Sequence, residues 1–452
     1  MKLVRYTIVS VMTVWFFATS CLAGDVFTLT KEEKELSKKK PVYPQTRFLA
    51  VTDTHFYSTS LGTEGKAFQD YLDNDRKLLV ESEKIVETVF DELSRITADF
   101  VIVSGDLTKD GEKINHEKMS IYLRKLALSG KKVFVVPGNH DVYNWESVRF
   151  DGEATEAVAN VTAMEFEKIY REFGYETALE RDLGSLSYIT EPVPGLWLLA
   201  LDSCRWKENK PGEHPITAGA FSDDTLQWIK KSLVRSRKED KAVIVFMHHG
   251  IVEHYPHNDK FYSDYIVSNH DEIAKMVSTF GVSLVFSGHF HSQDITLQKF
   301  KDPDRTLFDI ETGSLVTAPC PYRIVNIMAD QKIEIESRFL SSIPSRTSGF
   351  KEYSSDYVYK GTIKLADSAL KKYCVSKEDR QLLTSQISKA YVTHLKGDEI
   401  MPDQAIIKDG LGLWGKFVMF MQEDLIYGWY TDLPPADNNL VVDLSTGEYF
   451  PK

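Results

Sequence analysis

The chain has 452 residues, of which 42% are hydrophobic, and a formal net charge of −12. This length exceeds that of a typical single domain, so we expect two domains with packed cores. The negative charge, with no basic stripe, argues against a surface that follows a DNA or RNA backbone. It does not exclude a small phosphorylated substrate, because bound metal ions can reverse the local field inside one cleft.

The first 23 residues have the composition of an export signal, with a basic start, an apolar stretch at residues 8–17 and a small-residue cleavage region ending at Ala23. The apolar stretch is short for a membrane span. Two routes remain open. Cleavage after Ala23 would give a soluble protein, whereas residues 18–21 (ATSC) resemble a bacterial lipobox, in which Cys21 would be lipidated and attached to a membrane surface. Either route predicts an exported, extracytoplasmic protein with residues 24–44 as a polar tether.

Three more cysteines follow, at positions 204, 320 and 374. An odd number at such wide spacing does not predict a disulfide framework, and none belongs to a CxxC pair of the kind that structural zinc sites use. One bridge with one free thiol and three buried thiols both remain open.

From Thr46 to about Leu315, apolar runs alternate with stretches of helical period, which predicts an α/β sandwich closed by a strand-rich end. The predicted strands are Arg47–Val51, Phe100–Val103, Lys132–Val136, Leu196–Ala200, Ala242–Phe246 and Ser283–Phe286, followed by antiparallel strands at Thr306–Glu311, Tyr322–Met328 and Lys332–Phe339. The predicted helices are Asp75–Ile96, His116–Leu128, Thr162–Phe173, Asp223–Val234 and Asp271–Phe280. Ser222 is the expected N-cap of the fourth helix.

The chain changes character after residue 341, where small polar residues give way to helical periodicity. Helices are predicted at Tyr357–Tyr373, Glu378–Leu395 and Leu411–Ile426, with Ser376 and Asp379 as a capping box. The third is very apolar but contains Lys416, so we expect it to pack against the catalytic domain rather than enter a membrane. We therefore divide the chain into a catalytic domain at 45–341 and a helical accessory domain at 342–452.

Five short segments place metal-binding residue types directly after predicted strands. They are Asp53-Thr54-His55, Gly105-Asp106, Gly138-Asn139-His140-Asp141, His248-His249 and Gly288-His289-Phe290-His291. Each segment alone is ordinary, since strand ends and turns often carry Gly, Asn and Asp. Open α/β sheets place ligand sites where the carboxyl ends of their strands meet, so the five together predict one site.

These segments, in this order, resemble the signature DxH, GD, GNH[DE], H and GHxH of the calcineurin-like metallophosphoesterase superfamily. The resemblance spans roughly Thr46 to Leu340 and is nearest to bacterial class III cyclic nucleotide phosphodiesterases and their exported relatives. It implies a four-layer α/β/β/α sandwich and a hydrolase of phosphate esters with two metal ions. Lys109 stands where purple acid phosphatases carry a tyrosine, and the paired arginines of phosphoprotein phosphatases are missing from the motifs.

The resemblance also implies the ligands of the two metals. One ion would be bound by Asp53, His55 and His291, the other by Asn139, His248 and His289, and Asp106 would bridge both. Oxygen and nitrogen ligands without thiolates suit manganese, iron or zinc better than calcium. Since only the two aspartates carry charge, two such ions would leave an excess of positive charge that an anionic phosphate can neutralise.

His140 is the expected proton-transfer residue, since the histidine of GNH[DE] assists the leaving group or orients the phosphate in this family. Relatives support it with an aspartate three residues after the bridging one, where this chain has Lys109. The support comes either from Asp110 or from no residue at all. His254 and His257 are expected to be solvated loop residues.

The leading hypothesis is a phosphodiesterase, acting on substrates such as cyclic nucleotides, in which a metal-bridging hydroxide attacks phosphorus in line. A broad phosphomonoesterase or nucleotidase could use the same site. A surface binding protein whose metals capture phosphate without turnover is the alternative from another class. The expected partner is a small phosphorylated molecule rather than a nucleic-acid polymer.

Overall fold

The computed structural model describes residues 26–301 and 304–452. The predicted export signal, with Ala23 and Cys21, lies outside these residues. Within them, no helix combines the length and apolar character that a membrane crossing requires. Cys204 and Cys320 are buried free thiols and Cys374 is an exposed one.

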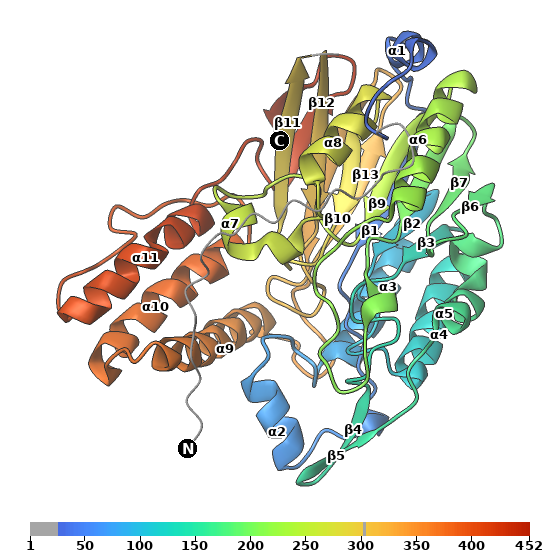
Figure 1. Ribbon diagram of the computed structural model, residues 1–452. Coiled ribbons are helices and arrows are strands. Elements are labelled where there is room, and N and C mark those ends of the chain that lie inside the picture. The colour runs from blue at the N-terminus through green and yellow to red at the C-terminus, as the bar shows by residue number, and fades with distance from the viewer. Residues whose placement is uncertain (1–25, 302–303) are drawn as a thin grey trace, which may run out of the picture.

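Two seven-stranded sheets form the centre of the protein (Figure 1). The first runs in the order β16 (Glu448–Pro451), β15 (Asn439–Asp443), β14 (Lys332–Phe339), β13 (Pro321–Ile327), β1 (Thr46–Val51), β2 (Phe100–Ser104) and β3 (Lys132–Val136). The second runs β11 (Asp294–Lys301), β12 (Asp304–Glu311), β10 (Leu284–Ser287), β9 (Ala242–Met247), β8 (Leu196–Leu201), β7 (Tyr188–Val193) and β6 (Glu180–Arg181). A small hairpin joins β4 (Val148–Asp151) to β5 (Ala154–Ala157).

The inner faces of the two sheets share one apolar core, to which Phe48 and Val101 contribute from the first sheet and Leu198 and Phe286 from the second. The rings of Phe48 and Phe286 meet edge to face at 5.3 Å. Strands β1, β2 and β3, of which β3 is the edge of the sheet, are parallel and are largely apolar, as strands covered on both faces are.

Helices cover both outer faces and complete the predicted four layers. They are α3 (Ser82–Arg95), α4 (Lys113–Leu128) and α5 (Ala163–Ile169) on the first sheet's side, and α6 (Asp223–Lys238) and α8 (His270–Thr279) on the second sheet's side. Shorter elements lie in the loops: α2 (Lys66–Asp73), α7 (Asn258–Tyr262) and the single turns Thr59–Leu61, Arg171–Tyr175, Trp206–Glu208 and Ser263–Tyr265. Ser222 caps α6 as predicted, accepting a hydrogen bond from the Thr225 N–H.

The segment predicted to be a tether is packed against the body of the protein over residues 26–44. It forms α1 (Lys31–Ser37), whose Glu33 pairs with Lys230 of α6 at 3.2 Å. The side chain of Tyr43 is buried, and its hydroxyl donates to the carbonyl of Val243 at 3.2 Å. The tether prediction was wrong here because the segment is held by contacts with residues far along the chain, such as Lys230 and Val243, that its composition does not show.

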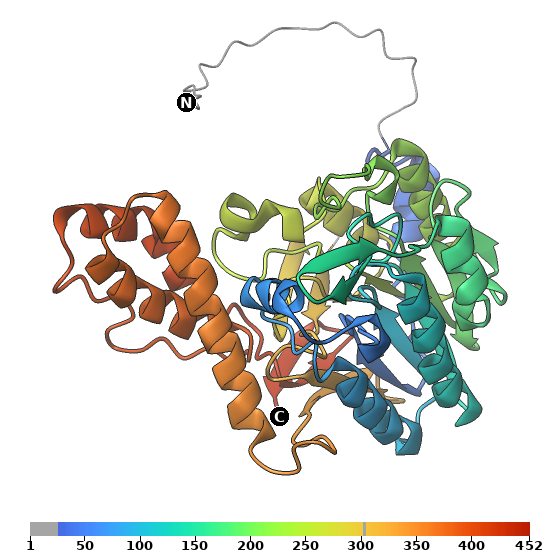
Figure 2. The ribbon, with the colours of Figure 1, turned by 90° about the horizontal axis from the view of Figure 1, so that it is seen from below.

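The C-terminal region contains the three predicted helices, α9 (Phe350–Lys372), α10 (Lys377–His394) and α11 (Leu413–Trp429), beside the sandwich (Figure 2). Ser376 caps α10 by accepting from the Asp379 N–H, which is one of the two hydrogen bonds of the predicted capping box. The expectation of helix to the end of the chain was wrong, because β15 and β16 return to the first sheet and extend it beyond β14. The helical region is thus fastened to the catalytic domain at both of its ends.

Helix α11 packs against the catalytic domain in part, as predicted, and in part against the other two helices. Its buried residues, such as Met419 and Ile426, join a core shared with α9 and α10. Only its C-terminal end approaches the catalytic domain, where Trp429 stacks near Tyr262 at 5.9 Å. Six large side chains of the helix are exposed, namely Leu413, Trp414, Phe417, Phe420, Met421 and Tyr427.

Candidate metal centre

All seven predicted ligand residues lie in loops that follow strands of the two sheets. The loops after β1, β2 and β3 come from the first sheet and those after β9 and β10 from the second. Because the two sheets pack face to face, the carboxyl ends of these strands meet over one edge of the sandwich. The five motifs of the sequence are therefore brought together in one place.

The backbone of these loops is unusual. Five of the seven residues have a left-handed φ, between 33° and 79°, namely Asp53, His55, Asp106, His289 and His291. Such values are uncommon for residues other than glycine and cost of order 1–3 kcal/mol each, so they persist only where the surroundings impose them. Their concentration in one cluster marks it as a functional site.

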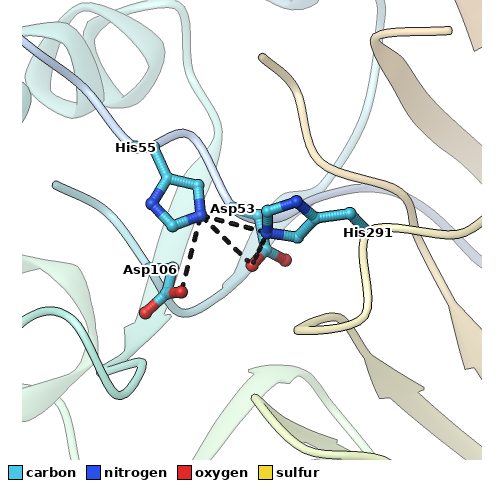
Figure 3. Close-up of side chains that lie close together, drawn as sticks. All are labelled: Asp53, His55, Asp106 and His291. Atoms are coloured by element: carbon cyan, nitrogen blue, oxygen red, sulfur yellow. Dashed lines mark hydrogen bonds and ion pairs between the residues drawn. The ribbon is translucent and has the colours of Figure 1, made fainter. Parts of the chain in front are cut away.

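The first group consists of Asp53, His55, Asp106 and His291, whose potential ligand atoms all lie within 4.8 Å of one another (Figure 3). His55 Nε2 lies 3.5 Å from Asp106 Oδ2 and 3.1 Å from His291 Nε2. His291 Nε2 is in turn 3.3 Å from Asp53 Oδ1.

The second group consists of Asp106, His248 and His289. His248 Nε2 lies 3.4 Å from Asp106 Oδ2 and 3.0 Å from the side-chain oxygen of Asn139. Asp106 belongs to both groups, so one carboxylate lies between two sets of histidines. This is the arrangement that the sequence motifs predicted.

The residues of both groups fit metal ions. Among the described residues, Asp53 Oδ1 and His289 Nε2 are buried atoms without a hydrogen-bond partner. Leaving such an atom unsatisfied costs about 1–3 kcal/mol, which coordination would remove. Burial lowers the pKa of His55 and of His289 well below the ordinary value, so both imidazoles are neutral, the form that binds metals.

The structure separates the two neighbouring histidines after β9. His248 points to Asp106, as described above. The ring of His249 is engaged on both nitrogens, with Nδ1 2.8 Å from the Ser203 hydroxyl and Nε2 2.8 Å from the carbonyl of Thr217. His249 is thus a structural residue, and the choice of His248 from the motif agrees with the geometry.

His140 has the aspartate support that the sequence left open. Its Nδ1 donates to Asp110 Oδ1 at 2.7 Å, while its Nε2 faces Asp106 Oδ2 at 4.0 Å. Burial acts to lower the pKa of His140, but the carboxylates of Asp106 and Asp110 outweigh it and raise the pKa above the ordinary value. Lys109 is fully buried and pairs with Asp110 and with Glu112, so it holds this aspartate in place.

Asp141 holds the loops of Asp106 and His140 together. Its carboxylate accepts hydrogen bonds from the N–H groups of Leu107, Thr108 and Gly138 at 2.9–3.0 Å, and from the Thr108 hydroxyl. The loop also binds Asp106 directly, since the His140 N–H donates to Asp106 Oδ1 at 2.9 Å. Asp141, the last residue of the motif Gly138–Asp141, is thus a scaffold for Asn139 and His140.

A polar cleft of about 250 Å³ opens onto Asp106, Asn139 and His140. Sequence reasoning missed its outer wall, in which Arg76 and Lys77 of the loop after α2 face Tyr391 of α10. The Arg76 guanidinium lies over the Tyr391 ring, 4.3 Å from its centroid. The only signal in the sequence was a basic pair within a predicted helix, which is common on solvated surfaces.

Two tyrosines of the second sheet's loops, Tyr262 and Tyr265, line the same cleft. Tyr265 packs on the ring of His289 at 4.5 Å. The cleft is therefore lined by metal ligands, by two cations and by aromatic rings.

His254 is buried, which corrects the expectation of a solvated loop residue. It is 3% exposed, and its Nδ1 donates to Asp294 Oδ1 at 2.8 Å. Its Nε2 lies 3.5 Å from Asp309 and 3.7 Å from Glu311. These acids come from β11, which was not predicted, and from β12, and they meet His254 only through tertiary packing.

The family model of the calcineurin-like phosphoesterases matches residues 46–293, more than half of the chain. The chain belongs to this family of metal-dependent phosphoesterases. A curated relative, the "Probable cyclic nucleotide phosphodiesterase" of Coxiella burnetii, is 23% identical over 198 residues, which cover 43% of this chain and 60% of that protein.

Two solved structures resemble the fold at low identity. A dimetal phosphatase from Danio rerio is 15% identical, with a TM-score of 0.46, over 66% of this chain and 97% of that one. The purple acid phosphatase PPD1 from yellow lupin seeds is 12% identical, with a TM-score of 0.40, over 67% of this chain and 52% of that one.

Gly138 tests whether the close approach of the loops controls the centre. A Cβ at this position would overlap the carboxylate and backbone nitrogen of Asp106. We expect Gly138→Ala to displace Asp106 and to lower both the bound metal, measured by elemental mass spectrometry, and the esterase activity by more than about 10-fold. Gly184→Ala is the matched control, because its Cβ would meet its nearest neighbour at 3.4 Å. Unchanged metal content in Gly138→Ala would contradict this reading.

Proposed function

We propose that this protein hydrolyses phosphodiesters of the nucleotide type, cyclic nucleotides included, with two metal ions held by the seven residues described above. The observation that carries the proposal is the position of Asp106, shared by two ligand groups at the base of an open cleft. The printed description of the Coxiella burnetii relative supports the same substrate class.

Two bound ions would activate water and stabilise negative charge on the phosphoryl oxygens. The imidazoles of His55, His248, His289 and His291 and the carboxylates of Asp53 and Asp106 would hold them. Asn139 adds an uncharged oxygen at 3.0 Å from His248 Nε2. The burial of these groups keeps bulk water from competing for the ligand positions.

His140 is placed to give a proton to the departing oxygen. Its Nδ1 is fixed by Asp110, so the proton on Nε2 faces the Asp106 side, where the ester would lie. The hydrogen bond to Asp110 favours the protonated ring, as a general acid requires.

Lys77 and Arg76 would attract the anionic ester. Burial acts to lower the pKa of Lys77, but Asp75, Asp110 and Asp106 raise it above the ordinary value, so the ammonium stays charged. Lys77 therefore adds positive charge beside the metal ligands. Arg76, held over Tyr391, lies farther out in the wall, where the leaving group of a diester would reach.

The substrate class is tested by removing metal with chelator, restoring manganese, and comparing bis-p-nitrophenyl phosphate with p-nitrophenyl phosphate. The proposal predicts a higher kcat/KM for the diester. Preference for the monoester would move the assignment to a phosphatase or nucleotidase. If the metal-loaded protein hydrolyses neither ester and no cyclic nucleotide, the alternative of a surface binding protein without turnover would be favoured.

Asp110→Asn tests the role of His140. The amide keeps the shape but loses the charge that holds the imidazole, so we expect kcat on a cyclic nucleotide to fall about 10- to 100-fold with metal content unchanged. The loss should be smaller on bis-p-nitrophenyl phosphate, because p-nitrophenolate leaves without a proton. Equal losses on both substrates would instead indicate general disruption of the centre, and no loss would remove Asp110 from the account.

Arg76→Met tests the outer wall of the cleft. Without the guanidinium we expect the KM for a cyclic nucleotide to rise about 5- to 30-fold, the equivalent of roughly 1–2 kcal/mol of binding, while kcat changes little. Arg95→Met, at the exposed end of α3, is the control. A fall in kcat at constant KM would show that Arg76 acts on the reacting group and not on substrate binding.

A further inference from the structure

A second cluster of metal-binding residue types lies where the helical region meets the second sheet. It consists of Asp294 at the start of β11, His394 at the end of α10 and Glu399 in the loop that follows, and we call it the interface triad. One ligand atom from each lies within 4.8 Å of the other two. All three side chains are at least nine-tenths buried.

Two atoms of the interface triad are left without partners. His394 Nδ1 donates to Glu399 Oε1 at 2.6 Å. The other ring nitrogen, His394 Nε2, and the other carboxylate oxygen, Glu399 Oε2, are buried and have no hydrogen-bond partner among the described residues. Both side-chain hydrogen bonds that Asp294 accepts, from His254 and Thr296, end on Oδ1. Each member of the triad thus has an atom available to bind a metal ion.

The surroundings are rich in acids, of which Asp294 is paired with His254. Burial and repulsion by Asp294 raise the pKa of Glu399 above the ordinary value despite the hydrogen bond from His394. Burial and neighbouring acids raise the pKa of Asp432 to about 7. The buried Arg323 does not pair with these carboxylates; it donates to hydroxyls and to backbone carbonyls such as those of Glu311 and Asp437.

A neighbouring acidic group shows what a satisfied cluster looks like. Asp437 accepts from the N–H groups of Ile295 and Asp398, and Asp398 accepts from the Asp437 N–H and from Asn438. Their oxygens are already used to join the loops, so they offer no comparable site. The interface triad differs because two of its atoms, His394 Nε2 and Glu399 Oε2, are buried and have no hydrogen-bond partner among the described residues.

We propose that Asp294, His394 and Glu399 bind a further divalent transition-metal ion, separate from the pair at Asp106. One imidazole and two carboxylates form a ligand set that suits zinc or manganese. The ring of His394 packs on the ring of Phe290, with centroids 5.3 Å apart. In the sequence, Phe290 stands between the two motif histidines His289 and His291. An ion at the triad would therefore fasten the helical region to the loop that carries two ligands of the candidate metal centre.

The full chain should be stripped with chelator, restored with excess zinc, desalted and measured by elemental mass spectrometry. We expect about three zinc ions per chain for the native protein and about two for Glu399→Gln and for His394→Gln. Asp106→Asn, which affects the other centre, should retain the interface ion. Glu378→Gln, an exposed position in the first turn of α10, is the control and should keep all three.

Equal zinc content in the native protein and in a folded Glu399→Gln variant would overturn the proposal. If both triad variants fail to fold, the native protein alone decides: a content that saturates at two ions per chain contradicts a third site. If the proposed two-metal centre at Asp106 is wrong, the native protein should be inactive. That result is separate from the zinc content of the triad variants, which tests the interface triad.

Discussion

The architecture of the site depends on one carboxylate, Asp106, held between two groups of histidines. Its position is fixed from several sides: the chain turns through a left-handed φ of 48° at this residue, and the His140 N–H binds Oδ1. Gly138 leaves no room for a side chain beside it. The buried carboxylate of Asp141 ties the two loops to one another. Two packed sheets are needed to supply this arrangement, because His55 comes from a loop of the first sheet, as Asp106 does, whereas His248, His289 and His291 come from loops of the second.

Much of the catalytic site could be predicted from the sequence, because its residues stand in short motifs directly after strong apolar strands. All seven candidate ligands were named in advance, and the structure brings them together. The roles of neighbours could not be read in the same way. Whether Asp110 reaches His140, and whether His248 or His249 faces the metals, depends on loop backbone angles that no local pattern encodes. Arg76, Lys77 and Tyr391 meet only through tertiary packing.

Most of the predicted strands and helices of the sandwich agree with the structure to within a few residues, since the parallel strands are continuous apolar runs and the helices are periodic. The helix predicted at Asp75–Ile96 begins instead at Ser82, and β6, β7 and β11 were not predicted. The failures lie where long-range contacts decide. The last two strands are short and partly polar; β15 is stabilised by pairing with β14 far back in the chain, and β16 pairs with β15. Acidic residues and histidines are usually expected on the surface. The junction of the helical region with the second sheet nevertheless buries Asp294, His254 and Glu399.

The central claim, that Asp106 is shared by two metal ions, is tested most directly by electron paramagnetic resonance of the protein restored with manganese(II). Two ions bridged by one carboxylate interact magnetically, so the account predicts the spectrum of a spin-coupled pair, absent from Asp106→Asn. Isolated manganese signals at every loading, without a coupled pair in the native protein, would contradict it.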